Sequence, residues 1–315
     1  MKPLLPLAIL LLTACVHAQE FPSKPIHIIA PAAAGSGTDL TARVIGQQMG
    51  DILKTAVIVD NKVGTSVGVD YVVRSAADGY TLLLSTDATV AIQPHVMALG
   101  YNTLADLAPI GEVGNFPLFV LSAAGSGMKT IADVARVARA NPKGLSYGMG
   151  GQGTGGHIVG ETVRLALNVP MTAIAYPSAS RAVNDLMGGY VELAFADTTS
   201  VAQVKAGKLQ AIATASATRA SCLPDVSTLS EQGVPFDLPY SYGLLAPART
   251  PKAVIDKLNS ALQAALRTAA VRNQQQQDCV SPPPADNRPE DFARRLRYHH
   301  EKWGAMIRTA GVKIS

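Results

Sequence analysis

The chain has 315 residues, of which 48% are hydrophobic and 16% are charged, and its formal net charge is +4. This composition is too apolar for a disordered protein, and the charge is not gathered into the basic stripe of a nucleic-acid-binding protein. The length suits about two domains with large cores, and the 27 glycines favour a glycine-rich mixed α/β protein.

The first residues predict an export signal rather than an element of the fold. The apolar run over 4–12 is too short to span a membrane. Residues 16–18 fit a cleavage site that would remove a signal peptide over 1–18. Residues 12–15 alternatively resemble a bacterial lipobox, in which Cys15 would be lipidated and become the new N-terminus. Both alternatives predict export to the periplasm.

The mature chain alternates strand-like and helix-like segments, which is the βαβ rhythm of a parallel sheet covered by helices. The pattern predicts strands over 25–30, 56–59 and 80–84 and helices over 39–52 and 69–77. It begins again after Val120, with a helix from 129, strands over 145–147, 172–176, 191–195 and 211–215, and helices over 157–167 and 180–187. This repetition predicts a second α/β unit.

The end of the chain is expected to return to the first unit through a strand over 242–246 and helices over 251–268 and 290–310. Five residues at helical spacing should dock the last helix on the core: Phe292, Leu296, His299, Trp303 and Ile307. The group His299-His300-Glu301 on this helix is otherwise expected to form a partly solvated face. The glutamines over 274–277 and the prolines over 282–284 predict an exposed connection.

These patterns predict two domains joined by two crossings, near 110–121 and 238–246. We assign residues 19–120 and 239–315 to the first domain and 121–238 to the second. Ligands of open α/β sheets bind beyond the carboxyl ends of the strands. A cleft between the two domains is therefore the expected ligand site.

Small residues over 31–39, between the first strand and its helix, are typical of an anion-binding turn. Backbone N–H groups and the start of a helix both favour negative charge. An ordinary turn with Ser36 or Thr38 as the helix N-cap would show the same pattern. Asp39 has the wrong sign for touching an anion, so it would orient the loop amides or an ammonium group. The candidate ligand-binding residues here are Ala33, Gly35, Ser36, Gly37, Thr38 and Asp39.

A second glycine-rich segment, over 148–157, contains the spacing GxGxxG. A dinucleotide site would need an acidic residue at the end of the next strand, and the strand over 172–176 ends without one. We therefore predict a second anion-binding loop and no cofactor. His157 would bond either a ligand or a loop carbonyl. Two such loops on two domains could grip the two ends of a dicarboxylate.

The sequence lacks the signatures GxxxxGK[ST], HExxH and GxSxG, so it is not expected to be an enzyme. It also has no cluster of cysteine and histidine residues that suggests a metal site. The two cysteines of the mature chain, Cys222 and Cys279, could form a disulfide in an oxidising compartment. Two separate buried thiols are the alternative.

The order of several short motifs resembles the Bug (TctC-type) family. They lie at 24–29, 78–83, 153–161, 185–189, 205–209, 224–226 and 243–247, and the match extends from about Phe21 to Gly311. The family comprises extracytoplasmic solute-binding receptors, many of which serve tripartite tricarboxylate transporters. The resemblance implies a two-domain α/β Venus-flytrap fold, the type II periplasmic-binding-protein fold. It also implies a small carboxylate ligand held mainly by main-chain amides and water.

The resemblance places further residues in the expected cleft. In the second loop the matching candidates are Gly153, Thr154, Gly155 and His157, and beyond the loops they are Thr86, Tyr176 and Asp197. The chain departs from the family pattern at Ala32, where an aromatic residue is usual, at Ala34, and at 177–179. These departures leave the size of the pocket and the identity of the carboxylate open.

The expected function is that of an exported, monomeric receptor that closes over a small carboxylate and presents it to membrane transporter subunits. Binding favours the closed state only if the ligand contacts both domains. One alternative is a ligand sensor that feeds a signalling partner. Another is a secreted hydrolase in which Ser36 or Thr154 would pair with His157 in the same cleft.

Overall fold

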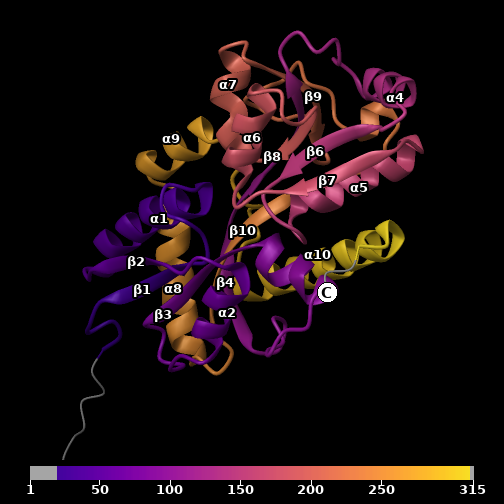
Figure 1. Ribbon diagram of the computed structural model, residues 1–315. Helices are drawn as coiled ribbons and strands as arrows, with labels where there is room; N and C mark the ends of the chain where they lie inside the picture. Colours follow the sequence, from indigo (N-terminus) through magenta and orange to yellow (C-terminus); the bar gives the residue numbers. More distant parts are fainter. Residues whose placement is uncertain (1–19, 313–315) are drawn as a thin grey trace, which may run out of the picture.

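The computed structural model describes residues 20–312. Within this range the strands form two five-stranded mixed sheets, which build two lobes that meet in the middle of the molecule (Figure 1). The predicted α/β fold with two units is confirmed. The expected signal peptide and Cys15 lie outside the described residues. Among the residues that are described, no helix is long and apolar enough to cross a membrane.

The first sheet has the strand order β2-β1-β3-β10-β4. Its strands are β1 (Ile26–Ala30), β2 (Val57–Asn61), β3 (Thr81–Thr86), β4 (Leu107–Phe116) and β10 (Tyr240–Pro247). The first three are parallel, and β10 runs antiparallel to both β3 and β4. Most side chains of β1 and β3 are buried, as expected for central strands that have apolar runs and helices on both faces.

Helices from both ends of the chain pack around this sheet. They are α1 (Gly37–Leu53), α2 (Thr65–Val73), α8 (Lys252–Leu266), α9 (Ala269–Gln277) and α10 (Pro289–Ala310), with the short η1 (Ala88–Ile92) and α3 (Gln93–Val96) after β3. The five residues expected to dock α10 are all buried. Helix α10 also contacts α5 of the other lobe, so it connects the two lobes by packing.

The second sheet has the order β7-β6-β8-β5-β9. Its strands are β5 (Leu118–Ala123), β6 (Leu145–Met149), β7 (Met171–Ala175), β8 (Leu193–Ala196) and β9 (Leu209–Ala215). Strands β6, β7 and β8 are parallel, whereas β5 is antiparallel to β8 and β9. Its helices are α4 (Ile131–Ala140), α5 (Gly155–Leu167), α6 (Ala179–Met187), α7 (Val201–Lys205) and the single turns η2 (Thr198–Ser200) and η3 (Ser230–Gln232).

The chain passes from the first sheet to the second at Pro117, between β4 and β5. This point lies a few residues before the expected division after Val120, which falls inside β5. The βαβ rhythm does not reveal the crossing because one residue, and no helix, separates β4 from β5. The return crossing joins β9 to β10 through residues 216–239.

One local expectation was wrong. The glutamines over 274–277 lie in helix α9 rather than in an exposed connection, because Thr268 caps this helix by accepting the Val271 N–H. Within the run, Gln275 is buried and donates to the Val113 carbonyl at 2.9 Å. On α10, His299 is buried against Asp87 at 2.9 Å, as its docking position predicts, whereas His300 is half-buried and Glu301 is exposed.

Cys222 and Cys279 form a disulfide, with their Cα atoms 5.4 Å apart. The alternative of two separate thiols is therefore wrong for this structure. Cys222 follows β9 of the second sheet, whereas Cys279 follows α9, which packs on α1 of the first. The bond thus joins segments that belong to the two lobes.

Candidate ligand-binding site

A layer of three aromatic side chains lies where the two lobes meet. Phe116, at the end of β4, pairs with Tyr240 at the start of β10. The Phe116 ring stacks on Tyr242 with centroids 4.3 Å apart and meets Tyr240 edge-on at 5.0 Å. Tyr240 and Tyr242 are alternate residues of one strand, so they share a face. We call Phe116, Tyr240 and Tyr242 the aromatic layer.

The start of α1 reaches the aromatic layer at Tyr242. A Cβ atom added to Gly37 would lie 2.9 Å from the Tyr242 hydroxyl oxygen, so only glycine fits at this approach. The side chain of Thr41, one turn into α1, also lies near the Tyr242 hydroxyl. Burial raises the pKa of Tyr242, and the nearby Asp197 carboxylate raises it further. The first loop and Asp197 therefore face the same tyrosine from different lobes.

The start of α5 reaches the layer at Tyr240. The Gly155 N–H lies near the Tyr240 hydroxyl, and any Cβ atom at this glycine would collide with the tyrosine ring. The Ala88 N–H and the Thr86 side chain lie near the same hydroxyl from the first lobe. One hydroxyl thus connects α5 with the turn after β3. The N-terminal ends of α1 and α5 consequently converge on adjacent tyrosines.

Asp39 organises the first loop. Its buried carboxylate accepts hydrogen bonds from the Gly35 N–H at 2.8 Å, from Asn61 at 2.9 Å and from Arg43 at 3.1 Å. Burial alone would raise the pKa of Asp39, but these hydrogen bonds and the Arg43 charge outweigh it and hold the pKa below its usual value. The interpretation of Asp39 as an orienting group fits these contacts.

The amides of the first loop fall into two groups. Those of Gly35 and Ser36 are used inside the loop, on Asp39 and on the Ala33 carbonyl. Ser36 is the N-cap of α1, as the ordinary interpretation of the turn predicts, and accepts the Asp39 N–H at 3.3 Å. Gly37 and Thr38 form the first turn of α1, where N–H groups have no acceptor within the helix. These two amides are suited to an anion.

The second loop is organised by His157. Its Nδ1 atom accepts the Gly153 N–H at 3.2 Å, so the loop partner is an N–H rather than the expected carbonyl. Burial lowers the pKa of His157, which favours the neutral ring that can accept this bond. Thr154 donates its hydroxyl to the Gly151 carbonyl at 2.8 Å. Neither this hydroxyl nor that of Ser36 bonds to His157, so the pairs expected of a hydrolase are not formed.

Two further candidates from the sequence, Asp197 and Tyr176, lie on the second lobe. Asp197 caps η2 by accepting the Thr199 N–H at 3.1 Å, and its charge acts on Tyr242. Tyr176 packs its ring over Gly148, where the second glycine-rich segment begins, and its hydroxyl lies near Asp185 on α6. The structure thus brings together the two loops, Thr86 and Asp197, with Tyr176 against the start of the second loop.

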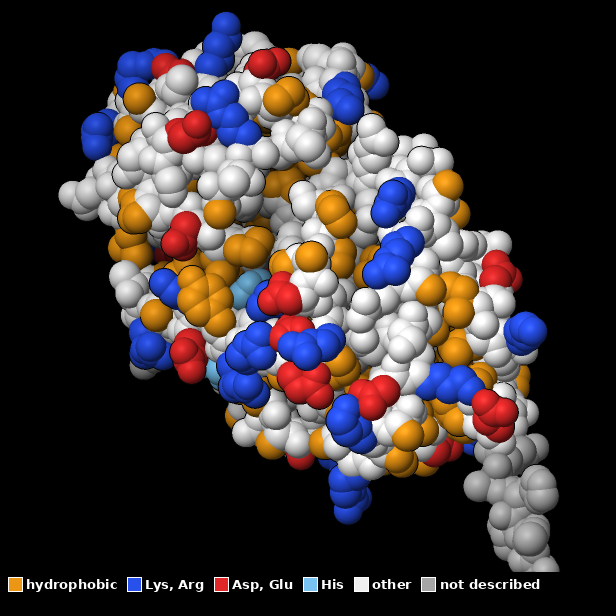
Figure 2. Space-filling view, turned by 180° about the vertical axis from the view of Figure 1, so that it is seen from behind, with side chains coloured by type: hydrophobic (Ala, Val, Ile, Leu, Met, Phe, Trp, Pro, Cys, Tyr) orange, Lys and Arg blue, Asp and Glu red, His pale blue; other side chains and the backbone are white. Residues whose placement is uncertain are grey.

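Charged side chains do not form a broad patch on the surface that Figure 2 shows, where basic and acidic groups are interspersed. At the first loop the basic side chain is Arg43, and Asp39 neutralises it. The polar groups that the two loops bring to the aromatic layer are therefore backbone amides and tyrosine hydroxyls.

Residues 41–312 match the family described as tripartite tricarboxylate transporter family receptor, TctC. The chain belongs to this family. It is 29% identical over 309 residues to Protein BugT of Bordetella pertussis, which covers 96% of this chain and 94% of BugT. It is 30% identical to the periplasmic binding protein BugD, whose structure matches with a TM-score of 0.85. The match covers 93% of this chain and 99% of BugD.

A further similar structure is R. palustris Rpa4515 with adipate, which is 25% identical and has a TM-score of 0.86. The match covers 93% of this chain and 99% of Rpa4515. These likenesses confirm the resemblance to the Bug family and the periplasmic-binding-protein fold. The chain is therefore a solute-binding receptor of the type that serves tripartite tricarboxylate transporters, in a family of receptors that act in the periplasm.

Proposed function

We propose that this receptor is exported, captures a small carboxylate between its two domains as a monomer, and delivers it to the membrane subunits of a tripartite transporter. The convergence of the α1 and α5 N-termini on the aromatic layer carries this proposal. The two helices come from different domains, so a carboxylate that contacts both would favour the closed state.

Helix N-termini supply the chemistry. The amides of Gly37 and Thr38 on α1, and those of Thr154 and Gly156 around the start of α5, lie in first turns, where N–H groups lack helical acceptors. Each amide bond to a shielded carboxylate contributes about 1.5–3 kcal/mol, and the helix dipoles add to this attraction. The adipate in the Rpa4515 structure supports a dicarboxylate as the first ligand to test.

Calorimetric titration against a panel of C4–C6 di- and tricarboxylates, amino acids and aromatic acids tests the proposal. We expect at least one acid to bind with a dissociation constant in the micromolar range or below. Its methyl ester should not bind, because the ester lacks the charge that the helix ends attract. Folded protein that binds no acid of the panel, or that binds an acid and its ester equally, would contradict the carboxylate assignment.

Tyr240→Phe is expected to weaken binding of the best acid about fivefold. The change removes the polar atom that the Gly155 N–H, the Ala88 N–H and the Thr86 side chain lie near, and leaving such buried groups without it costs about 1 kcal/mol in the closed state. Tyr147→Phe is the matched control, because it removes a buried hydroxyl that bonds to Glu161 inside the second domain. Titration of both variants should show a loss for Tyr240→Phe alone, and equal losses would place the Tyr240 hydroxyl outside the binding mechanism.

A further inference from the structure

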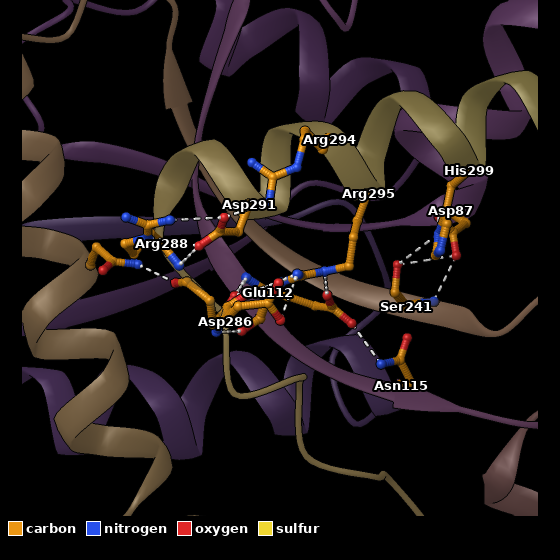
Figure 3. Close-up of polar contacts among 12 residues, drawn as sticks. Asp87, Glu112, Asn115, Ser241, Asp286, Arg288, Asp291, Arg294, Arg295 and His299 are labelled. Carbon is orange, nitrogen blue, oxygen red and sulfur yellow. Dashed lines mark hydrogen bonds and ion pairs between the residues drawn. The ribbon is translucent and has the colours of Figure 1, made fainter.

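Figure 3 shows a buried network of one carboxylate, one imidazole and one serine, formed by Asp87, His299 and Ser241. Asp87 Oδ1 lies 2.9 Å from His299 Nδ1. Asp87 Oδ2 accepts the Ser241 N–H at 2.6 Å and the Ser241 hydroxyl at 3.1 Å. Asp87 follows β3, Ser241 lies on β10 and His299 lies on α10. One carboxylate therefore holds three elements together.

Two residues of this network, Asp87 and Ser241, are chain neighbours of residues that form the ligand site. Asp87 is flanked by Thr86 and Ala88, whose polar groups lie near the Tyr240 hydroxyl. Ser241 lies between Tyr240 and Tyr242 on β10, so it connects the carboxylate to both tyrosines of the aromatic layer. A shift of Asp87 would move the turn after β3 and the tyrosines relative to each other.

We propose that His299 is a positioning residue for the ligand site: as an imidazolium it fixes Asp87, and ligand affinity falls when the imidazole loses its proton. The proposal rests on the function proposed above. Asp87 is 1% exposed and His299 is 6% exposed. A carboxylate at such burial is strongly destabilising unless it is paired. His299 supplies the pairing charge.

The other charged groups around His299 are compensated among themselves. Glu112 on β4 pairs with Arg295 on α10, and these two act on His299 with opposite signs. His95 on α3 bonds through Nε2 to the His300 carbonyl at 2.8 Å. The His300 ring lies 3.5 Å from the Val90 carbonyl oxygen rather than at Asp87.

The direction of the pH dependence follows from these contacts. Burial alone would lower the pKa of His299, but the charge and hydrogen bond of Asp87 outweigh it, so the pKa is raised above its usual value. A raised pKa means that the pair is complete below the pKa of the unfolded chain and is lost as the pH rises through the folded value. The pKa of His157 is shifted the other way, because burial lowers it, so His157 loses its proton at a lower pH than His299. Loss of affinity on the alkaline side therefore reports on His299.

The test is titration calorimetry with the tightest-binding acid of the panel above, adipate being assayed first, between about pH 6.5 and about pH 9. Wild-type protein should bind about five- to tenfold more weakly at the alkaline end, because a buried charge then lacks its partner. His299→Gln should bind weakly throughout, with a flat profile. His300→Gln, a neighbour on the same helix, should keep the wild-type profile.

Each outcome separates the two proposals. If wild-type protein binds no acid at any pH, the carboxylate function is wrong and the role of His299 falls with it. If folded His299→Gln keeps the wild-type pH profile, or if wild-type protein shows no alkaline loss, only the role of His299 is overturned. Should His299→Gln fail to fold, Asp87→Asn serves instead, because it removes the charge that His299 pairs with and should also flatten the profile.

Discussion

Removing the Cys222–Cys279 disulfide is expected to lower the free energy of unfolding by about 2–4 kcal/mol. The two cysteines are 57 positions apart, and a bond that closes a long loop restricts the unfolded chain strongly. Cys279 is buried among apolar residues of the second domain. A serine at this position would therefore add a buried hydroxyl to the loss of the covalent bond.

The disulfide also connects the two domains. On one side, Cys222 belongs to the second domain. On the other, Cys279 lies between α9 and Ser281, whose N–H donates to the Asn115 carbonyl of β4 at 2.7 Å. The disulfide is thus a covalent link between the domains, close to strand β4.

Thermal and denaturant unfolding of the Cys222→Ser, Cys279→Ser double variant measures the loss. Reduced wild-type protein is the control, and it should unfold at a midpoint below that of the oxidised protein and no lower than that of the double variant, which also buries a serine hydroxyl. Full stability of either sample, with thiol titration showing that the bond is absent, would show that the disulfide contributes little to the folded state.

Asp39→Ala is expected to weaken carboxylate binding about 100-fold. The change releases the Gly35 N–H, Asn61 and Arg43 at once, and leaving such partners unpaired costs about 1–3 kcal/mol. About 2.7 kcal/mol corresponds to a hundredfold change in the dissociation constant. The loss should appear in affinity because the ordered loop presents the Gly37 and Thr38 amides.

The matched control is Asp133→Ala. Asp133 holds the same position in the first turn of α4 that Asp39 holds in α1, and its capping box with Thr130 is exposed on the second domain. This variant should lose about 1 kcal/mol of stability and keep its affinity. Equal affinity of Asp39→Ala and wild-type protein in calorimetric titration would show that Asp39 serves only the helix.

The sequence predicts well what depends on neighbours along the chain. The βαβ rhythm, the two glycine loops and the orienting role of Asp39 follow from local patterns. The aromatic layer does not, because Phe116 and Tyr240 meet only through the pairing of β4 with β10. The one available signal was the alternate spacing of Tyr240 and Tyr242 in the segment over 238–246 that was expected to return to the first domain.

The pairing of Asp87 with His299 could not be predicted either. The two residues are 212 positions apart, and each has an ordinary role when its own segment is considered alone. The spacing of α10 predicts that His299 is buried, but it does not identify the charge that compensates it. Burial of an ionisable side chain is therefore the signal that should prompt a search for a distant partner.

A crystal structure of the protein with the tightest-binding acid of the panel tests the central claim most directly. We expect the ligand between the two domains, with its carboxylate oxygens accepting N–H groups from the first turns of both α1 and α5, beside Tyr240 and Tyr242. A ligand bound outside this cleft, or held by lysine and arginine side chains in contact with one domain only, would contradict the account.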